Sequence, residues 1–316
     1  MSQLFRRNIL FEAGAADKVD ANQFIANDQP ETFHISFDGE LSVEPEPNIM
    51  EVQIFNLNRK SRTAIENAER ARLSFGYADA GVKKIFEGDI AMVRSDHSGV
   101  DWITSVTIAD AGRALKYGRV NETFPPGTTY AEYFATVCQS FNIASGVVVP
   151  LTFCGKNTAI FAASMVQGTG TPENCQYYGN KQKKKKKPKK TMFANGLTIS
   201  KPARKVLEDL CNTHGLLFFI HDNMLFILPE DDSGIITGLM WEETDAESGM
   251  LGYPSKLEDG GVSVRAFIDP RFSPGGGVTV WSKQDDLTLS YRISHITIVG
   301  SNFENDCYME METFAP

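Results

Sequence analysis

The side chains most able to do chemistry are scattered through this sequence at spacings that common catalytic centres do not use. No HxxxH or HExxH pattern occurs, so zinc-dependent hydrolysis is not indicated. A GxSxG nucleophile elbow and a GxxxxGK[ST] phosphate loop are also absent. We interpret the histidines as structural residues; they are His34, His97, His214, His221 and His295.

Paired carboxylates occur at Asp231-Asp232 and at Glu242-Glu243, and two glycines lie close together at Gly168 and Gly170. A glycosidase needs two carboxylates that face each other across a cleft, and sequence alone cannot show that arrangement. The glycines lack the strand-to-helix context of a phosphate cradle. We therefore interpret these residues as surface and loop positions, and we expect no enzymatic activity, no cofactor and no metal.

The cysteines are odd in number and widely spaced. No CxxC pair occurs, so neither a zinc ribbon nor a dithiol redox site is indicated. We expect buried free thiols at Cys138, Cys154, Cys175, Cys211 and Cys307.

The run KQKKKKKPKK at 181–190 is the most concentrated charge in the chain. Adjacent like charges repel and Pro188 blocks a helix, so we expect a solvated loop. Contact with an acidic neighbour or with DNA is left open as its role. Removing its eight positive charges from the formal net charge of −9 leaves −17, and such an acidic body disfavours general nucleic-acid binding. The candidate interaction residues are Lys181, Lys183, Lys184, Lys185, Lys186, Lys187, Lys189 and Lys190.

The chain length of 316 residues allows two or three domains, or one large domain. No window of about 18 apolar residues predicts a membrane-spanning helix, and the N-terminus lacks the apolar core of a signal peptide. We therefore expect folding in a cytoplasm.

The short alternating strands of residues 1–112 predict a small β-barrel or β-sandwich. We expect a hairpin turn at Asp38-Gly39, a strand with Val52 and Ile54 on one face, and a short helix that begins at Ser61 or Thr63.

Residues 113–235 are expected to form a middle α+β domain. An apolar stripe over TTYAEYFATVCQSFNI predicts one helix. A second helix is expected to begin at Ser200 and to end before Gly215, followed by a hairpin turn at 221–223. Residues 236–316 again read as strands, with a turn at 274–277, and predict a second barrel.

These segments resemble, in order, the baseplate hub proteins of contractile-tailed bacteriophages. The first domain matches through VQIFNLNRKSRTAI, ARLSFGY and KKIFEGDIAMV, the middle through FANGLTISKPARKVLEDLCNTHGLLFFIHDNMLFILP, and the last part through FIDPRFSPGGGVTVWS and YRISHITIVGSNFENDCYMEMET. About three quarters of the chain is covered, and residues 143–195 have no counterpart. The matching residues of the first domain are Ile54, Asn56, Leu57, Gly76, Tyr77, Ile85, Phe86, Gly88 and Ile90.

The resemblance implies a structural virion protein of the tail baseplate, assembled in the host cytoplasm. It implies a homotrimer in which each subunit gives two tail-tube-like barrels, so that three subunits make a ring of six. Such a ring joins a six-fold tail tube to a three-fold spike, with a tape-measure protein as a further candidate partner and DNA passing through the lumen. An acidic wall would repel that DNA.

Two other functions remain open at this point. A tail-associated cell-wall hydrolase would clear peptidoglycan, and a lysine-tailed nucleic-acid binder would lose affinity steeply as salt rises.

Overall fold

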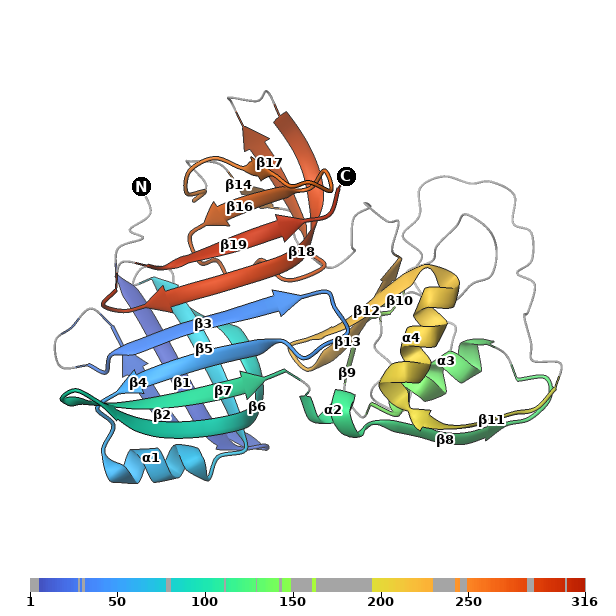
Figure 1. The fold of residues 1–316 in the computed structure, drawn as a ribbon, viewed down its shortest axis with the longest axis horizontal. Coiled ribbons are helices and arrows are strands. Elements are labelled where there is room, and N and C mark those ends of the chain that lie inside the picture. The colour runs from blue at the N-terminus through green and yellow to red at the C-terminus, as the bar shows by residue number, and fades with distance from the viewer. Residues whose placement is uncertain are drawn as a thin grey trace. The chain divides into compact units, whose positions relative to one another are not determined.

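The computed structural model describes residues 6–27, 29, 32–77, 81–110, 112–128, 130–141, 144–148, 161–162, 195–229, 242–244, 249–282, 287–304 and 306–315 (Figure 1). The chain divides into two compact units. Unit 1 consists of Met1–Val43, Pro47–Gly112 and Ser233–Pro316, and unit 2 consists of Glu44–Glu46 and Arg113–Asp232.

Unit 1 is built on one large, mostly antiparallel sheet. Its strands pair in the order β15-β16-β19-β18-β3-β4-β7-β6-β5-β1-β2, and β17 adds to β18 and carries β14 in parallel. The bounds are β1 (Arg7–Ala15), β2 (Lys18–Ala26), β3 (Ile35–Ser42), β4 (Ile49–Phe55), β5 (Arg70–Tyr77), β6 (Gly81–Ser98), β7 (Asp101–Ala109), β14 (Glu242–Thr244), β15 (Ser255–Lys256), β16 (Val262–Ala266), β17 (Gly277–Ser282), β18 (Leu287–Ser301) and β19 (Tyr308–Thr313). The fold is mainly β, as expected.

The pairing between the described strands does not close into a barrel. Strand β2 pairs only with β1, and β15 pairs only with β16. Strand β18 joins the two ends of the chain, because its first part pairs with β17 and its second part pairs with β3 and β19. The early and late strands thus share one sheet, and two separate barrels stay a prediction.

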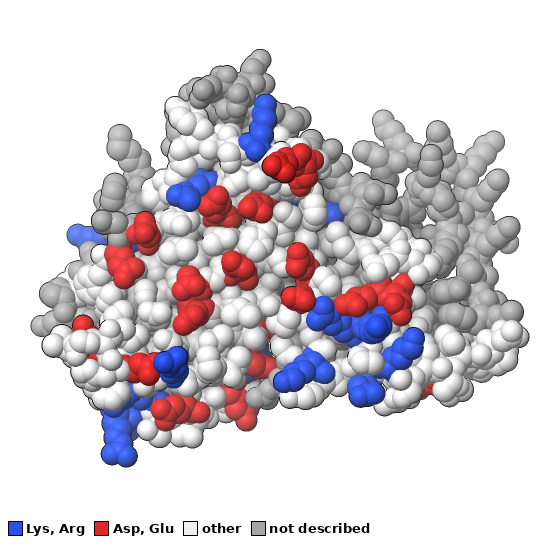
Figure 2. Space-filling view, in the orientation of Figure 1, with Lys and Arg blue, Asp and Glu red and all other residues white. Residues whose placement is uncertain are grey.

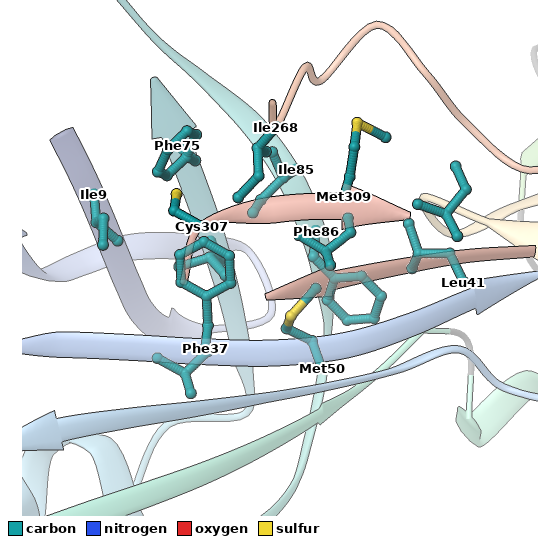
Figure 3. Close-up of a cluster of buried hydrophobic side chains, with 14 of the residues drawn as sticks. Ile9, Phe37, Leu41, Met50, Phe75, Ile85, Phe86, Ile268, Cys307 and Met309 are labelled. Carbon is teal, nitrogen blue, oxygen red and sulfur yellow. The ribbon is translucent and has the colours of Figure 1, made fainter. Parts of the chain in front are cut away.

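The core of unit 1 follows from strict alternation along the strands. On β4, Met50, Val52 and Ile54 are fully buried, while the residues between them face outward. Residues distant in sequence meet here: Figure 3 shows Cys307 and Met309 beside side chains from the first third of the chain. Each such large apolar side chain contributes about 1.5–3 kcal/mol on burial.

The expected turn at Asp38-Gly39 is wrong. Both residues lie inside β3, which pairs with β4 on one side and β18 on the other. The glycine is needed for space rather than for a turn, because a Cβ at Gly39 would lie 2.7 Å from the Met50 sulfur and 2.8 Å from the Ile49 carbonyl oxygen.

Helix α1 (Arg59–Glu66) begins earlier than expected. Its N-cap is Asn58, whose side-chain oxygen accepts a hydrogen bond of 2.9 Å from the Ser61 amide. Ile65 is its buried residue and anchors the helix to the core. The expected start at Ser61 or Thr63 is therefore wrong by one turn, because an asparagine also caps a helix.

Unit 2 combines a four-stranded sheet, a two-stranded sheet and helices. The four-stranded sheet runs β10-β9-β13-β12, and β8 pairs with β11. The bounds are α2 (Gly112–Tyr117), β8 (Arg119–Phe124), α3 (Tyr130–Gln139), β9 (Ala144–Val148), β10 (Phe161–Ala162), β11 (Leu197–Pro202), α4 (Ala203–His214), β12 (Leu216–His221) and β13 (Met224–Pro229). The helix expected over TTYAEYFATVCQSFNI is confirmed as α3, with Phe134 and Val137 buried, and Phe141 just beyond its end is buried as well.

The predicted end of α4 is confirmed and its predicted start is not. Gly215 adopts the left-handed conformation, with φ 62°, that ends many helices. Ser200 lies within β11 and its hydroxyl donates to the Asn121 side chain, while Pro202 takes the N-cap position. The hairpin after α4 turns at Asp222 and Asn223, both with positive φ, as predicted.

Three of the expected free thiols are described, and all are buried without a disulfide. Burial raises the pKa of Cys138 and of Cys211 to about 12, so both stay protonated and unreactive at neutral pH. Cys154 and Cys175 lie outside the described residues. In the part of the chain that the structure describes, no helix is long and apolar enough to cross a membrane.

Candidate interaction surfaces

The outward face of β3 and β4 carries a row of carboxylates that we call the acidic face: Asp38, Glu40 and Glu51. These residues alternate with the buried Phe37, Leu41 and Val52, so their side chains point away from the core. Asp38 and Glu51 are direct cross-strand partners. Red side chains lie across this side of unit 1 in Figure 2.

The charge of the acidic face is not neutralised. Among the described residues no Lys, Arg or His forms an ion pair with Asp38, Glu40 or Glu51. The pKa of Asp38 is raised, first by partial burial and then by the charges of Glu51 and Glu40. Like charges directly opposite each other on a sheet destabilise it, so this arrangement weakens the isolated fold.

On the outward face of β1, β5 and β6 the carboxylates are paired with arginines. Arg72 donates to Glu87 at 2.9 Å and to the buried Glu12 at 3.3 Å, and Gln23 donates to Glu12 at 2.8 Å. Arg70 also contacts Glu87, at 3.3 Å. Charges there are balanced across neighbouring strands, so the unbalanced acidic face is a local property rather than a feature of the whole sheet.

A second surface lies where β3 and β7 begin and β4 ends. Asn56, with φ 57°, follows β4 and holds the start of β7 through three hydrogen bonds. Its amide donates to the Trp102 carbonyl at 2.7 Å, its side-chain oxygen accepts from the Trp102 amide at 3.1 Å, and its side-chain nitrogen donates to Asp101 at 2.8 Å. The tip of the β6–β7 hairpin is thereby fixed to the sheet.

Aromatic rings lie on both faces of the sheet beside Asn56, and we call them together the aromatic end: His34, Phe55 and Phe303 on one face, and His97 and Trp102 on the other, with Val100 exposed at the hairpin tip. The His34 ring stacks on Phe55 at 4.1 Å between centroids and meets Phe303 edge-on at 5.4 Å. The Arg62 guanidinium lies 4.1 Å from the centre of the Trp102 ring.

The pKa of His34 is lowered, because partial burial outweighs the opposing charges of Glu304 and Asp101. The imidazole is therefore neutral at neutral pH and behaves as one more aromatic ring in this group.

The histidines expected to be structural do not come together as a site. His34 precedes β3, His295 lies in β18 and His221 ends β12. No group of three metal-ligating side chains occurs within the described ranges. The predicted lysine loop, Asp231-Asp232, Gly168 and Gly170 lie outside the described residues, and Glu242-Glu243 forms part of β14.

Neither surface was identified from the sequence, although one signal was available for each. Asn56 belongs to the segment that carries the family resemblance, and an asparagine that ends a strand can mark a left-handed residue. The carboxylates of the acidic face alternate with apolar residues along β3, which is the sign of an exposed sheet face.

No protein-family model and no curated protein matches the sequence. Solved structures do. The 43 kDa tail protein of prophage MuSo2 from Shewanella oneidensis superposes with a TM-score of 0.57 at 9% identity, over 98% of both chains. A tail protein from Neisseria meningitidis MC58 gives 0.55 at 10% identity, over 97% of this chain and 96% of that one.

The chain has the fold of phage tail proteins. A third structure, the E. coli c3393 protein, gives a TM-score of 0.51 at 10% identity over 90% of this chain and 73% of that one. It is described as a component of the type VI secretion system with structural similarity to the T4 bacteriophage tail proteins gp27 and gp5. The resemblance to tail proteins seen in the sequence is thus confirmed at the level of the fold.

Proposed function

We propose that this protein is a structural subunit of a phage tail, the hub of the baseplate of a contractile-tailed phage. The observation that carries the proposal is a fold shared with a prophage tail protein over 98% of both chains. Its place is the virion tail, after assembly in the host cytoplasm. In this role the protein catalyses no reaction and binds no cofactor.

In this proposal three subunits form a ring that joins the six-fold tail tube to the three-fold spike. Each subunit supplies two similar strand-rich parts, 1–112 and 236–316, on either side of the middle domain at 113–235, and three subunits supply six. Among the described strands, β2 and β15 each have a partner on one side only, and this supports a ring, because an exposed strand edge is normally covered and a closed assembly covers it without a new chain. A tape-measure protein is a further partner.

We propose that the acidic face lines the lumen through which DNA passes. A wall that carries Asp38, Glu40 and Glu51 without paired cations repels phosphate and so lets DNA slide without binding. The lysine loop is assigned to a contact outside that path, with an acidic neighbour in the baseplate.

The test is the mass of the purified chain by light scattering, together with electron microscopy of the chain mixed with purified tube and spike proteins. A mass three times the 35.0 kDa of one chain, and rings that join tube to spike, are expected. A monomer that clears peptidoglycan in a zymogram would instead support the tail-associated hydrolase.

A further inference from the structure

Strand β2 leaves one side of the unit 1 sheet without a partner strand. Residues Lys18–Ala26 pair with β1, and among the described residues no hydrogen bond from any other element reaches their backbone. The backbone N–H and C=O groups that point away from β1 can therefore pair with a further strand. A protein that stays monomeric normally blocks such an edge.

The second half of β2 lacks the devices that block an edge. These devices are charged side chains, proline, and bulges that twist the strand away. Residues 22–26 contain neither a charge nor a proline, and they pair with Ile9–Ala13 in unbroken register. Ile25 supplies an apolar side chain on this stretch and is 55% exposed. This half of β2 is thus suited to pair with another chain.

The free half of β6 shows what a blocked edge looks like in the same sheet. Beyond Asp89, β6 pairs with β7 alone. This stretch carries an ion pair between Arg94 and Asp96, and its register with β7 shifts between Ile90 and Met92. Charge and an irregular register therefore protect β6, whereas neither protects the second half of β2.

A second unblocked edge lies on the first part of β18. Residues Leu287–Tyr291 pair with β17, whereas pairing with β19 begins only at Ile293 and pairing with β3 only at His295 (Figure 1). Among the described strands, the other side of this stretch is therefore unpaired. Like residues 22–26, it contains no charge and no proline.

The chain already joins its early and late strands by this kind of contact. Strand β18 pairs with β3 from His295 to Ser301, so its two strand-rich parts meet through backbone pairing. A second copy can repeat the contact with the two edges that remain, the β2 edge of one subunit against the β18 edge of the next. Such a head-to-tail contact uses two different surfaces, and it closes into a ring when the rotation between subunits allows.

We propose that residues 22–26 of β2 pair with residues 287–291 of β18 in a second copy of this chain, and that this pairing is the contact between subunits. Ile25 is the exposed apolar side chain that the contact covers. This inference rests on the proposed function, since the subunits that it joins are those of the hub. It explains why one chain keeps two unblocked edges, which a monomer would expose to aggregation.

The experiment measures the mass of the full chain by light scattering after a lysine is placed on each edge. Ile25→Lys charges the β2 edge and Ser290→Lys charges the β18 edge; both positions are exposed, so folding should be retained. Met92→Lys is the matched control, because it adds the same charge at a position, 58% exposed, on the β6 edge that is already blocked. Ile25→Val keeps an apolar side chain on β2. Circular dichroism checks that every variant is folded.

We expect the wild type, Ile25→Val and Met92→Lys to have three times the 35.0 kDa mass of one chain. Ile25→Lys and Ser290→Lys should each weaken association by about tenfold or more and appear as folded monomers at low protein concentration. An equal mixture of these two variants should form a dimer, because each supplies the intact edge that the other lacks.

Trimers of both lysine variants would overturn the inference and leave the hub in place, because the subunits would then join elsewhere. A mixture that stays monomeric would show that the two edges do not meet each other. Dissociation of Met92→Lys as well would show that the added charge acts without regard to position. A monomeric wild type would instead contradict the hub itself.

Discussion

Asp38 and Glu51 face each other directly across β3 and β4, two carboxylates on the outward side of the sheet. We expect Asp38→Asn to stabilise the protein by about 0.2–1 kcal/mol at pH 7, because it removes a like-charge pair. The native state raises the pKa of Asp38, so it holds the proton more tightly than the unfolded chain does. The gain should therefore be present at neutral pH and disappear as pH falls below the ordinary pKa of an aspartate.

Urea unfolding at pH 7 and at pH 3 measures this effect. The matched control is Glu87→Gln, on a balanced part of the same sheet. It should destabilise by about 1 kcal/mol at pH 7, because Glu87 accepts from Arg72 and pairs with Arg70. Destabilisation by both substitutions would contradict the assignment of the acidic face as an unneutralised surface.

The hydrogen bonds from Asn56 to the start of β7 lead to a prediction about the stability of the fold. Asn56→Ala removes two side-chain hydrogen bonds and places an alanine at φ 57°, so a loss of about 1–3 kcal/mol is expected. Asn56→Gly keeps the backbone conformation at little cost and should lose less. Chemical unfolding of both variants ranks them, and an alanine variant as stable as the glycine variant would argue against a left-handed residue at this position.

His34 makes the free energy of unfolding depend on pH. Because the native pKa lies below the ordinary value, the neutral ring contributes stability above about pH 6.5 that is lost as pH falls through the native pKa. Replacing His34 by Gln should flatten the decline of unfolding free energy between pH 7.5 and pH 5.5. The same slope in variant and wild type would show that another group is responsible.

Gly39 should tolerate no side chain. Gly39→Ala is expected to cost about 1–3 kcal/mol, because the new Cβ would press on the Met50 sulfur and the Ile49 carbonyl oxygen. Circular dichroism during thermal unfolding measures the loss. Ser36→Ala, on the outward face of the same strand, should change stability by no more than about 0.5 kcal/mol.

Sequence alone predicted elements well where alternation or periodicity was strong. Strand β4, helix α3, the end of α4 at Gly215 and the turn at Asp222 and Asn223 all follow from local chemistry. The Asp38-Gly39 prediction failed because Asp-Gly between apolar residues is equally typical of a tight turn and of a strand glycine beneath a large neighbour. Only the position of Met50 on the next strand distinguishes the two.

The two surfaces depend on pairings that no local pattern contains. The aromatic end combines His34 with Phe303, and the acidic face needs the register that places Asp38 opposite Glu51. The arrangement of the two strand-rich parts likewise depends on long-range pairing, since β18 pairs with strands from both ends of the chain, and two separate barrels stay a prediction. The sequence shows which residue types are present, but it does not show which of them come into contact in the fold.

The buried hydrogen bond from the Ile35 amide to the Asn302 side chain joins residues 267 apart in sequence, so it can form during synthesis only after Asn302 has left the ribosome. Strand β3 gains its partner β18 only when almost the whole chain has left the ribosome. Until then one edge of β3 lacks its strand partner and can pair with another nascent chain. Pairing between strands so far apart in sequence is also slow. The negative charges of Asp38 and Glu40 on β3 disfavour edge-to-edge pairing with another chain during that interval.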